Sequence, residues 1–302
     1  MMDSKPLRYS SEVQSALAVN KPLVALESTV IAHGLPRPQN LETAIRLEQI
    51  VREAGSLPAT IAILDGQFCV GLSDEEVRFI AEDEEIRKVS IRDLPIAIAQ
   101  QWNGATTVAS TSWIAHRAGI KVFSTGGIGG VHRSSLSDIS ADLPALANTS
   151  LVVVCSGAKI VLDLPATREW LETYGITVVG YQCDEMPAFY SRSSSLPVDV
   201  RVDSPEEVAQ LFLAQQALGI ERALLVTVPV PQEFEVPVES LEGALSAALQ
   251  QAESQPVVGR ELTPFLLSRM AQMSEGATLK ANIALLENNA RVAAAIAVTL
   301  AD

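Results

Sequence analysis

The sequence predicts an α/β protein: a layered α/β/α single domain with a mixed, largely parallel sheet and a helical C-terminal tail. Short apolar runs, typical of buried strands, alternate with segments whose apolar residues recur at helical spacing. From about residue 238 the pattern is almost wholly helical. Strands separated by helices form a parallel or mixed sheet with helices on both faces. We find no internal repeat, low-complexity segment or linker, so one domain is expected to span residues 1–302.

The first half of the chain alternates between the two patterns. A strand of residues 24–26 runs out at Glu27, and the next helical stripe is closed by Gly55, since glycine commonly ends helices. Ser73 and Glu76 make a capping box that opens an acidic helix. Further helices are expected at residues 10–19, 40–54, 94–101 and 106–118, and strands at 57–64 and 67–71.

The second half continues the alternation. Ser204 is placed to cap a helix, Pro205 occupies its first turn, and Gly219 ends it. The tail that follows reads as helix almost to the last residue. The strands expected in this half lie at residues 121–127, 151–157, 176–182 and 222–230.

The composition excludes several classes of protein. Lys plus Arg is 22 and Asp plus Glu is 36, so the formal charge is 22 − 36 = −14, and a nucleic-acid surface would need a concentrated basic face. No stretch resembles a signal peptide, and none approaches the ~20 apolar residues that span a bilayer. Three cysteines are too few for a disulfide framework and predict reduced thiols. We expect a soluble, cytoplasmic protein with a small-molecule substrate and no nucleic-acid or membrane partner.

Chemically active side chains follow three of the predicted strands. Glu27 ends the first, a glycine-rich turn of residues 124–133 follows the second, and Ser156–Gly157–Ala158–Lys159 follows the third. In open α/β sheets, ligands bind outside the carboxyl ends of the strands, so these groups are expected at one edge. Two alternatives stay open: Glu27 simply leaves the strand for water, and Lys159 extends along its apolar neighbours to reach solvent.

The glycine-rich turn belongs to neither common nucleotide-binding pattern. Residue 132, where a third glycine would complete a dinucleotide fingerprint, is His132, and the Gly-Lys-Ser/Thr ending of a P-loop is absent. Backbone N–H groups of residues 126–130, with His132 and Arg133 beside them, would suit an anion such as a phosphate. A plain tight turn is the alternative.

Asp138 and Asp142 lie four residues apart around an expected helix start. Acidic residues there either cap the helix or offer one hard carboxylate to Mg²⁺ or Mn²⁺. The three histidines, His33, His116 and His132, have no zinc-site spacing. The chain also lacks the G-x-S-x-G pattern of serine hydrolases.

Ten sequence blocks, taken in order, resemble those of the pseudouridine-5′-phosphate glycosidase family, from about residue 10 to near the C-terminus. They read ALESTVIAHGLPRPQN, PATIAILDG, KVSIRDLP, NGATTVASTSWIA, GIKVFSTGGIGGVHR, DISADL, VVVCSGAK, GYQ, TPFLLSRM and LKANIALLENN. The resemblance implies an α/β/α fold, a homotrimer and a bound Mn²⁺. It implies reversible cleavage of the carbon–carbon glycosidic bond of pseudouridine 5′-phosphate, giving uracil and ribose 5-phosphate.

The resemblance also implies roles for individual residues. Glu27 of ALEST would be the proton donor, Lys159 of CSGAK the nucleophile, and Asp138 of DISAD the metal ligand. The implied substrate-binding residues are Lys88, Val108, Ser140, Ala141 and Asp142, with Thr125, His132 and Asn282 as further candidates. One departure is the segment of residues 134–137, which is shorter than the corresponding loop of the family. We expect it to affect closure of the site and metal affinity.

The chemistry explains why an amine and an acid are needed together. Carbon is a poor leaving group, so the two carboxylates of ordinary glycosidases would not suffice. A lysine imine of the ring-opened sugar is an electron sink, and a buried acid can protonate the departing carbon. Two other functions remain open: another Schiff-base phosphosugar lyase or aldolase, and a non-catalytic phosphosugar-binding protein.

Overall fold

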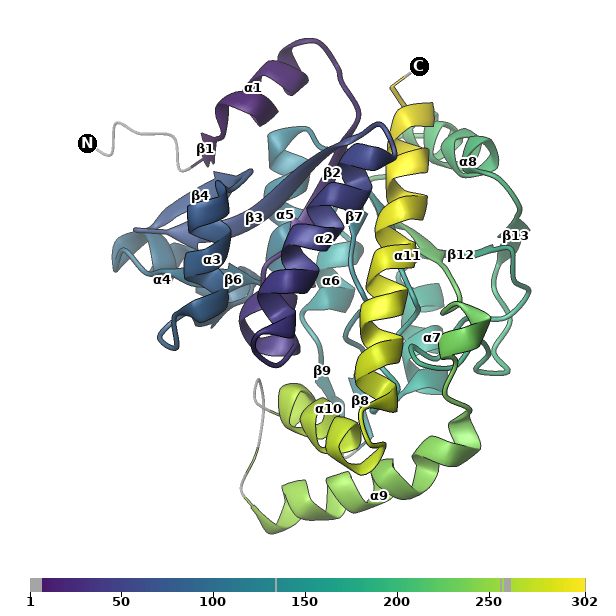
Figure 1. Cartoon of the computed structure of the whole chain (residues 1–302). Coiled ribbons are helices and arrows are strands. Elements are labelled where there is room, and N and C mark those ends of the chain that lie inside the picture. Colours follow the sequence, from purple (N-terminus) through teal and green to yellow (C-terminus); the bar gives the residue numbers. More distant parts are fainter. Residues whose placement is uncertain (1–6, 134, 256, 258–261, 302) are drawn as a thin grey trace.

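The computed structural model describes residues 7–133, 135–255, 257 and 262–301. Its centre is an eleven-stranded sheet with helices on both faces (Figure 1). Along the sheet the strands are β1 (Leu7–Tyr9), β4 (Gln67–Val70), β3 (Leu57–Leu64), β2 (Leu23–Glu27), β7 (Val122–Ser124), β10 (Val152–Cys155), β14 (Leu224–Thr227), β12 (Thr177–Tyr181) and β13 (Val200–Val202). Two more, β5 (Arg87–Val89) and β6 (Gly104–Thr106), continue from β3.

The sheet is parallel from β3 through β2, β7, β10, β14 and β12 to β13. Strands β4 and β6 run antiparallel to β3, whereas β1 is parallel to β4 and β5 to β6. The expected mixed, largely parallel sheet is therefore confirmed. Nearly every residue of β2, β10 and β14 is buried, as continuous apolar strands in a parallel sheet should be.

Helices enclose the sheet from both sides. Helices α2 and α11 lie on the face toward the viewer in Figure 1, and α5 and α6 lie behind it. The helices are α1 (Ser11–Ala18), α2 (Gln39–Glu53), α3 (Asp74–Glu82), α4 (Leu94–Ala99), α5 (Val108–Ala118), α6 (Asp142–Leu146), α7 (Leu164–Thr173), α8 (Pro205–Ala217), α9 (Val238–Ser254), α10 (Leu262–Met273) and α11 (Ala277–Thr299).

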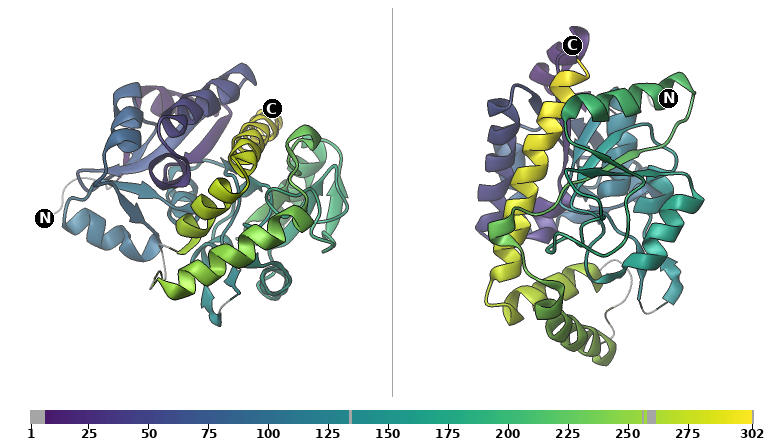
Figure 2. Two further views of the ribbon diagram at one scale, coloured as in Figure 1. Left: turned by 60° about the horizontal axis from the view of Figure 1, so that its bottom comes forward. Right: turned by 90° about the vertical axis from the view of Figure 1, so that its right-hand side faces the viewer.

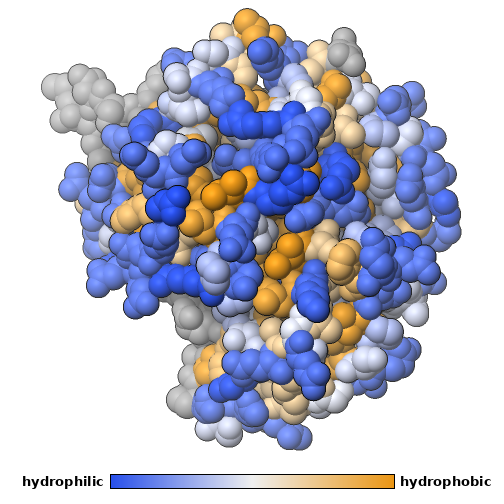
Figure 3. All heavy atoms as spheres, in the orientation of Figure 1, coloured by the Kyte–Doolittle hydropathy of each residue, from blue (hydrophilic) through white to orange (hydrophobic). Residues whose placement is uncertain are grey.

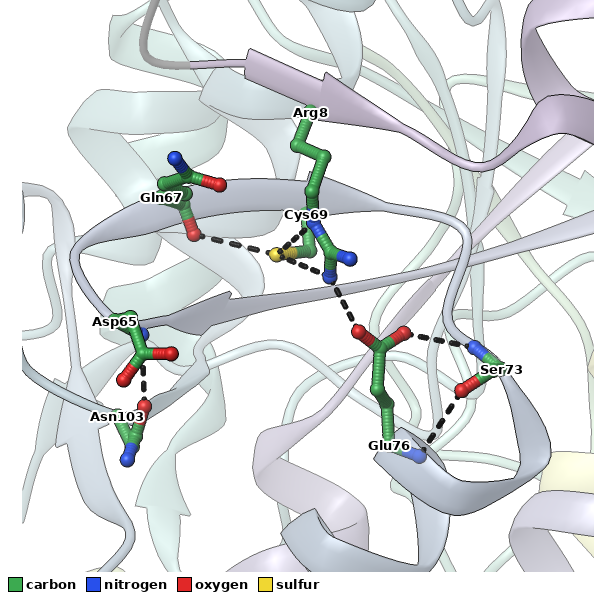
Figure 4. A network of polar contacts seen from close by, with 7 residues as sticks. All are labelled: Arg8, Asp65, Gln67, Cys69, Ser73, Glu76 and Asn103. Atoms are coloured by element: carbon green, nitrogen blue, oxygen red, sulfur yellow. Dashed lines mark hydrogen bonds and ion pairs between the residues drawn. The ribbon is translucent and has the colours of Figure 1, made fainter.

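The predicted helix ends form for the expected local reasons. The amide of Glu76 donates to the Ser73 hydroxyl at 3.3 Å, and its carboxylate accepts from the amide of Ser73 at 2.9 Å (Figure 4). Arg8 reaches the same carboxylate at 2.6 Å and the thiol of Cys69 at 2.9 Å, which fastens β1 to the start of α3. Gly119 ends α5 with a φ of 81°, a conformation that favours glycine.

The predicted helical tail is confirmed as α9, α10 and α11. Helix α11 crosses the whole molecule against β2, β7 and β10 and contacts α2 and α8 (Figures 1 and 2). Helices α9 and α10 pair with each other at the end of the molecule beyond the carboxyl ends of these strands. A second, three-stranded sheet of β11 (Leu162–Asp163), β8 (Val131–His132) and β9 (Ser135–Ile139) lies between.

The face shown in Figure 3 is mostly hydrophilic, with apolar residues exposed in patches near its middle. Among the described residues no helix is both long and apolar enough to cross a membrane. The single-domain prediction covers residues 1–302, some of which lie outside the described ranges, and it stays a prediction.

Candidate active site

Three neighbouring parallel strands deliver the predicted groups to one edge. Leu26 of β2 pairs with Ser124 of β7, which pairs with Val154 of β10. The segments that begin at Glu27, Thr125 and Ser156 therefore leave the sheet side by side. The expectation that they share an edge is confirmed.

Backbone hydrogen bonds join the segment after β7 to the segment after β10. The amide of Ser156 donates to the carbonyl of Gly126 at 2.9 Å, and that of Ile128 to the carbonyl of Gly157 at 3.0 Å. The amide of Lys159 in turn donates to the carbonyl of Ile128 at 3.1 Å. These bonds continue the sheet pairing past its formal end, so the backbone of Lys159 is fixed against the glycine-rich turn.

Asn289 of α11 forms hydrogen bonds with both of these segments. Its side chain is fully buried, and its Nδ2 donates to the carbonyl of Thr125 at 2.9 Å and to the hydroxyl of Ser156 at 3.1 Å. Asn282, two helical turns earlier, lines the cavity described below. The family resemblance implied Asn282 but not Asn289, which the packing of α11 on the sheet brings to this place.

Close approach of backbone explains two of the glycines. Gly157 has a φ of 77°, and a Cβ there would lie 2.0 Å from the carbonyl oxygen of Pro187. A Cβ on Gly129 would lie 2.2 Å from the hydroxyl oxygen of Ser140. A larger residue at either place would force the segments apart.

Two backbone amides of the glycine-rich turn, which was predicted to bind an anion, already form hydrogen bonds within the protein. The amide of Ile128 is bonded to Gly157, and the amide of Gly129 donates to Oδ2 of Asp142 at 2.8 Å. The prediction that the turn's amides hold a phosphate is therefore wrong for Ile128 and Gly129. Backbone groups that close the turn cannot also bind a ligand.

Arg133 does not stand beside an anion site either. Its Nε donates to the carbonyl of Leu162 at 3.0 Å and its Nη2 to the carbonyl of Ile160 at 3.3 Å. These carbonyls belong to the segment that directly follows Lys159. Arg133 thus ties the segment after Lys159 to β8.

Glu27 is a buried acid. Its side chain is 8% exposed, and Thr125 donates a short hydrogen bond to its Oε1. Burial raises the pKa of Glu27, with the charge of Asp142 acting in the same direction and those of Lys159 and Lys88 opposing it. The alternative in which Glu27 leaves the strand for water is wrong.

Lys159 is half-buried, and its side chain lines the same cavity as Glu27. The three residues after it, Ile160, Val161 and Leu162, are almost fully buried. The apolar neighbours of this lysine therefore belong to the core, while Lys159 itself lines the cavity. This placement favours a reactive role over simple extension to the outer surface.

The cavity has a volume of about 750 Å³, and almost every site residue predicted from the sequence lines it. Thr125 does not line it and lies behind Glu27. The predicted residues that do line it are Glu27, Lys88, Val108, His132, Asp138, Ser140, Ala141, Asp142, Lys159 and Asn282.

Several lining residues were not predicted. His33 and Leu35 reach the cavity from a π-helical turn, Val30–Gly34, and the residue after it. Such turns are rare and often lie at functional sites, but the sequence carried no periodic signal for one. Leu267 and Ala271 of α10 also line the cavity.

The two aspartates differ in structure. Asp142 is the first residue of α6, and its Oδ1 accepts from the amide of Ala109 in the first turn of α5 at 3.0 Å. Asp138 is half-buried in β9 and caps no helix, whereas Asp142 lies at the helix start but accepts from amides outside α6, so the capping interpretation is wrong for both. The expectation for the short 134–137 loop includes Ser134, which lies outside the described residues, and it stays a prediction.

The positive groups of the cavity gather at the start of α5. Thr107 and Val108 line it there, and the amide of Thr107 donates to the carbonyl of Val89 at 3.1 Å, next to Lys88. Arg92 lines the same region. The amide of Ala109 in this helix turn already donates to Asp142, so an anion here would be held chiefly by the charges of Lys88 and Arg92.

The side chains that could coordinate a metal ion near Asp138 limit the kind of metal site that the protein can form. Among the described residues no group of three or more His, Cys, Asp and Glu side chains is arranged to hold a metal ion. A single carboxylate that lines the cavity is a suitable hard ligand for a cation that keeps most of its waters. The described residues fit a largely hydrated Mn²⁺.

Relatives of known name match nearly the whole chain. A pseudouridine-5′-phosphate glycosidase of Caldanaerobacter subterraneus subsp. tengcongensis is 51% identical over 293 residues, covering 96% of this chain and 95% of the relative. That of Escherichia coli strain K12 is 51% identical over 294 residues, covering 96% and 94%.

Two solved structures share the fold over their full length. An indigoidine synthase A-like protein of Thermotoga maritima superimposes with a TM-score of 0.91 at 39% identity, covering 100% of this chain and 99% of the other. The prealnumycin C-glycosynthase AlnA, in complex with ribulose 5-phosphate, gives 0.91 at 40% identity, covering 99% and 98%. The family model described as indigoidine synthase A like protein matches residues 12–299, and the chain belongs to this family, together with the pseudouridine-5′-phosphate glycosidases.

Proposed function

We propose that this protein catalyses the reversible cleavage of pseudouridine 5′-phosphate to uracil and ribose 5-phosphate through a lysine imine of the ring-opened sugar. Relatives about half identical over nearly the full length carry the name of this activity. The observation that carries the proposal is the placement of a buried acid, Glu27, and an amine, Lys159, in one cavity at the ends of nearby strands.

The first step opens the ribose ring. Nζ of Lys159 becomes bonded to C1′, the bond between C1′ and the ring oxygen breaks with its electron pair going to that oxygen, and the proton that Nζ loses passes to the freed 4′ oxygen. The attacking amine must be neutral, because only an unprotonated nitrogen has the electron pair that forms the new bond. The backbone bond from Lys159 to Ile128 holds this residue in place during the attack.

The second step breaks the carbon–carbon bond. Glu27 transfers its proton to C5 of the uracil ring, and the C1′–C5 electron pair then stays with the base. The lone pair of Nζ forms the C=N bond to C1′ at the same time. Because burial raises the pKa of Glu27, the acid keeps its proton closer to neutral pH.

Water completes the balance. It hydrolyses the iminium to the aldehyde form of ribose 5-phosphate and frees Lys159, so the sum is nucleotide plus water giving uracil plus ribose 5-phosphate. In the synthetic direction every step is reversed, and Glu27 accepts the proton that leaves C5.

We assign the phosphate to the charge of Lys88, next to the start of α5, where the amides of Thr107 and Ala109 are already bonded within the protein. Lys88, Thr107 and Val108 all line this part of the cavity. The amides of Ile128 and Gly129 are engaged elsewhere, which removes the glycine-rich turn as the main cradle. Binding energy from this remote group can then support orientation at the reacting carbon.

Asp138 would hold Mn²⁺, with water as the remaining ligands. A bound divalent ion would supply positive charge near the oxygen atoms of the substrate. The homotrimer implied by the family is likewise a proposal, and light scattering on a sizing column would measure the molar mass of the assembly.

Product analysis tests the function. We expect the protein, incubated with uracil, ribose 5-phosphate and Mn²⁺, to form pseudouridine 5′-phosphate, identified by mass and by its resistance to acid hydrolysis. An imine on ribose 5-phosphate without any C-nucleotide would indicate another phosphosugar lyase or aldolase. Binding without an imine would indicate a phosphosugar-binding protein.

A further inference from the structure

Asn289 places an amide on the buried face of α11 among apolar neighbours. Its side chain is fully buried, as are those of Leu285, Ala290 and Ala293 on the same helix. Burying an amide costs free energy unless its hydrogen bonds are restored, and a leucine of the same branched shape would carry no such cost. The polar side chain is therefore explained by the groups that it bonds rather than by packing.

The buried amide reaches both segments that leave the sheet edge. Nδ2 of Asn289 donates to the carbonyl of Thr125 at 2.9 Å and to the hydroxyl of Ser156 at 3.1 Å. The Ser156 hydroxyl also lies 3.3 Å from Oδ1 of the same side chain. Close packing makes this reach possible: a Cβ on Gly126 would lie 3.2 Å from Cδ2 of Leu286, so a side chain there would press against α11.

Thr125 connects Asn289 to the proposed acid. Its amide donates to the carbonyl of Val154 at 3.0 Å and its carbonyl accepts from Asn289, so its backbone is held on both sides. Its hydroxyl donates a short hydrogen bond to Oε1 of Glu27. Because the backbone limits the directions in which a side chain can point, the bond from Asn289 helps to aim this hydroxyl at the acid.

Ser156 connects Asn289 to the proposed nucleophile, since it lies three residues before Lys159. Its amide donates to the carbonyl of Gly126 at 2.9 Å, and its carbonyl accepts from the amide of Phe189 at 2.9 Å. The bond between its hydroxyl and Asn289 is a further attachment at the start of the segment that carries the lysine. One side chain of α11 thus holds the approach to both reactive groups.

We propose that Asn289 is a positioning residue for both reactive groups of the site. Through Thr125 it orients the carboxyl of Glu27. Through Ser156 it orients the segment that carries Lys159. The inference rests on the proposed function, because it concerns the same acid and the same imine. Asn289 does not line the cavity, so it acts without touching the substrate, yet a misplacement of about 1 Å in the reacting groups can cost about 100-fold in rate.

The pH dependence of cleavage measures the effect on the acid. Burial raises the pKa of Glu27, and the charge of Asp142 adds to this rise. The charges of Lys159 and Lys88 and the hydrogen bond from Thr125 oppose it. A weaker bond from Thr125 leaves the rise less opposed, so the pKa of Glu27 goes up further. Because cleavage needs the protonated acid, its decline at alkaline pH should then begin at a higher pH.

The test compares the same substitution at two adjacent asparagines. Asn289→Leu keeps the branched shape of the side chain and removes its hydrogen bonds. We expect kcat for pseudouridine 5′-phosphate to fall about 10- to 100-fold and KM to stay within about threefold. Borohydride trapping of the imine with saturating ribose 5-phosphate should slow as well, and the alkaline decline should move to higher pH.

Asn288→Leu is the matched control. Asn288 precedes Asn289 on α11, but its Nδ2 donates to the carbonyl of Pro229 at 3.4 Å and not to either segment of the site. We expect its kcat, its trapping rate and its alkaline decline to stay close to those of the wild-type protein. Equal losses in the two leucine variants would overturn the inference.

Ser156→Ala removes one of the two links and leaves the carbonyl of Thr125 bonded to Asn289. Imine trapping should slow a few-fold, while the alkaline decline stays at the wild-type pH. Two backbone bonds still hold this segment, so the variant also decides the question if Asn289→Leu does not fold. Trapping at the wild-type rate in Ser156→Ala would then overturn the inference.

The outcomes separate the inference from the proposed function. An Asn289→Leu protein with a lower melting temperature but unchanged kcat and trapping rate would make Asn289 purely structural and overturn the inference. A raised KM with unchanged kcat would also overturn it, because the residue would then act on binding. Absence of both imine and cleavage in the wild-type protein would contradict the proposed function itself, whatever the variants do.

Discussion

The two sides of the cavity are built differently. On the sheet edge Ser28, Ser156 and Asn289 are fully buried, and each side chain is hydrogen-bonded to neighbouring backbone or side-chain groups. On the opposite side α10 presents half-buried Leu267 and Ala271, supported by a single buried row. Bond cleavage requires atoms held within a fraction of an ångström, which a densely hydrogen-bonded edge supplies better than a half-buried helix face. The edge is therefore expected to determine the reaction.

The largest effect should follow removal of the acid at the edge. Glu27→Gln keeps the size of the side chain and removes its proton, so we expect cleavage to fall about 10²–10⁴-fold. In the wild-type protein, cleavage should decline as pH rises through the raised pKa of Glu27, because the acid loses its proton. This alkaline decline should be absent from the residual activity of the variant, and its persistence there would assign the decline to another group.

The metal prediction concerns β9, which closes the edge from outside the main sheet. Asp138→Ala should give low activity that no longer responds to added Mn²⁺, because the proposed ligand is gone. Asp138→Asn, which keeps an oxygen donor without the charge, should respond only at higher Mn²⁺. Titration of activity against Mn²⁺ measures both, and a normal response in Asp138→Ala would place the metal elsewhere.

Lys88 should affect binding more than chemistry. We expect Lys88→Ala to raise the KM for pseudouridine 5′-phosphate about 10- to 100-fold, as loss of a charge-assisted contact to an anion would, with a smaller change in kcat. Turnover of unphosphorylated pseudouridine, already poor, should change little. A fall in nucleoside turnover equal to that of the nucleotide would remove the phosphate from the start of α5.

Arg133 should give the smallest effect. Its guanidinium bonds two carbonyls of the segment after Lys159, and Arg133→Lys cannot reach both in the same way. We expect kcat to fall a few-fold to about 10-fold while KM is unchanged, as for a residue that acts through positioning. The rate of imine formation, measured by trapping at short times, should fall in parallel; an unchanged trapping rate would limit Arg133 to stability.

The sequence predicted the sheet edge far better than the opposite side of the cavity. The apolar runs predicted strands that end just before Glu27 and Lys159, and so placed both residues at one edge of the sheet. Such runs can be recognised from a few consecutive residues, without knowledge of the rest of the fold. Asn289 depends on how α11 lies across two loops more than 130 residues away in the chain. Such contacts have no local signature.

Two expectations failed for physical reasons. The glycine-rich turn looked like an anion cradle because sequence does not reveal which amides are already bonded, as those of Ile128 and Gly129 are. Asp138 falls in a five-residue strand, β9, beside a two-residue partner, β8, and strands this short carry too few side chains to show alternation.

Borohydride trapping tests the central claim, that the edge forms a covalent imine on Lys159. Protein incubated with ribose 5-phosphate and reduced with borohydride should gain the mass of one reduced sugar phosphate per chain, and peptide mapping should place it on Lys159. Lys159→Ala should lose both the adduct and turnover, while Lys88→Ala should keep the adduct at saturating sugar phosphate. An adduct on Lys88, or no adduct under conditions that give turnover, would contradict the account.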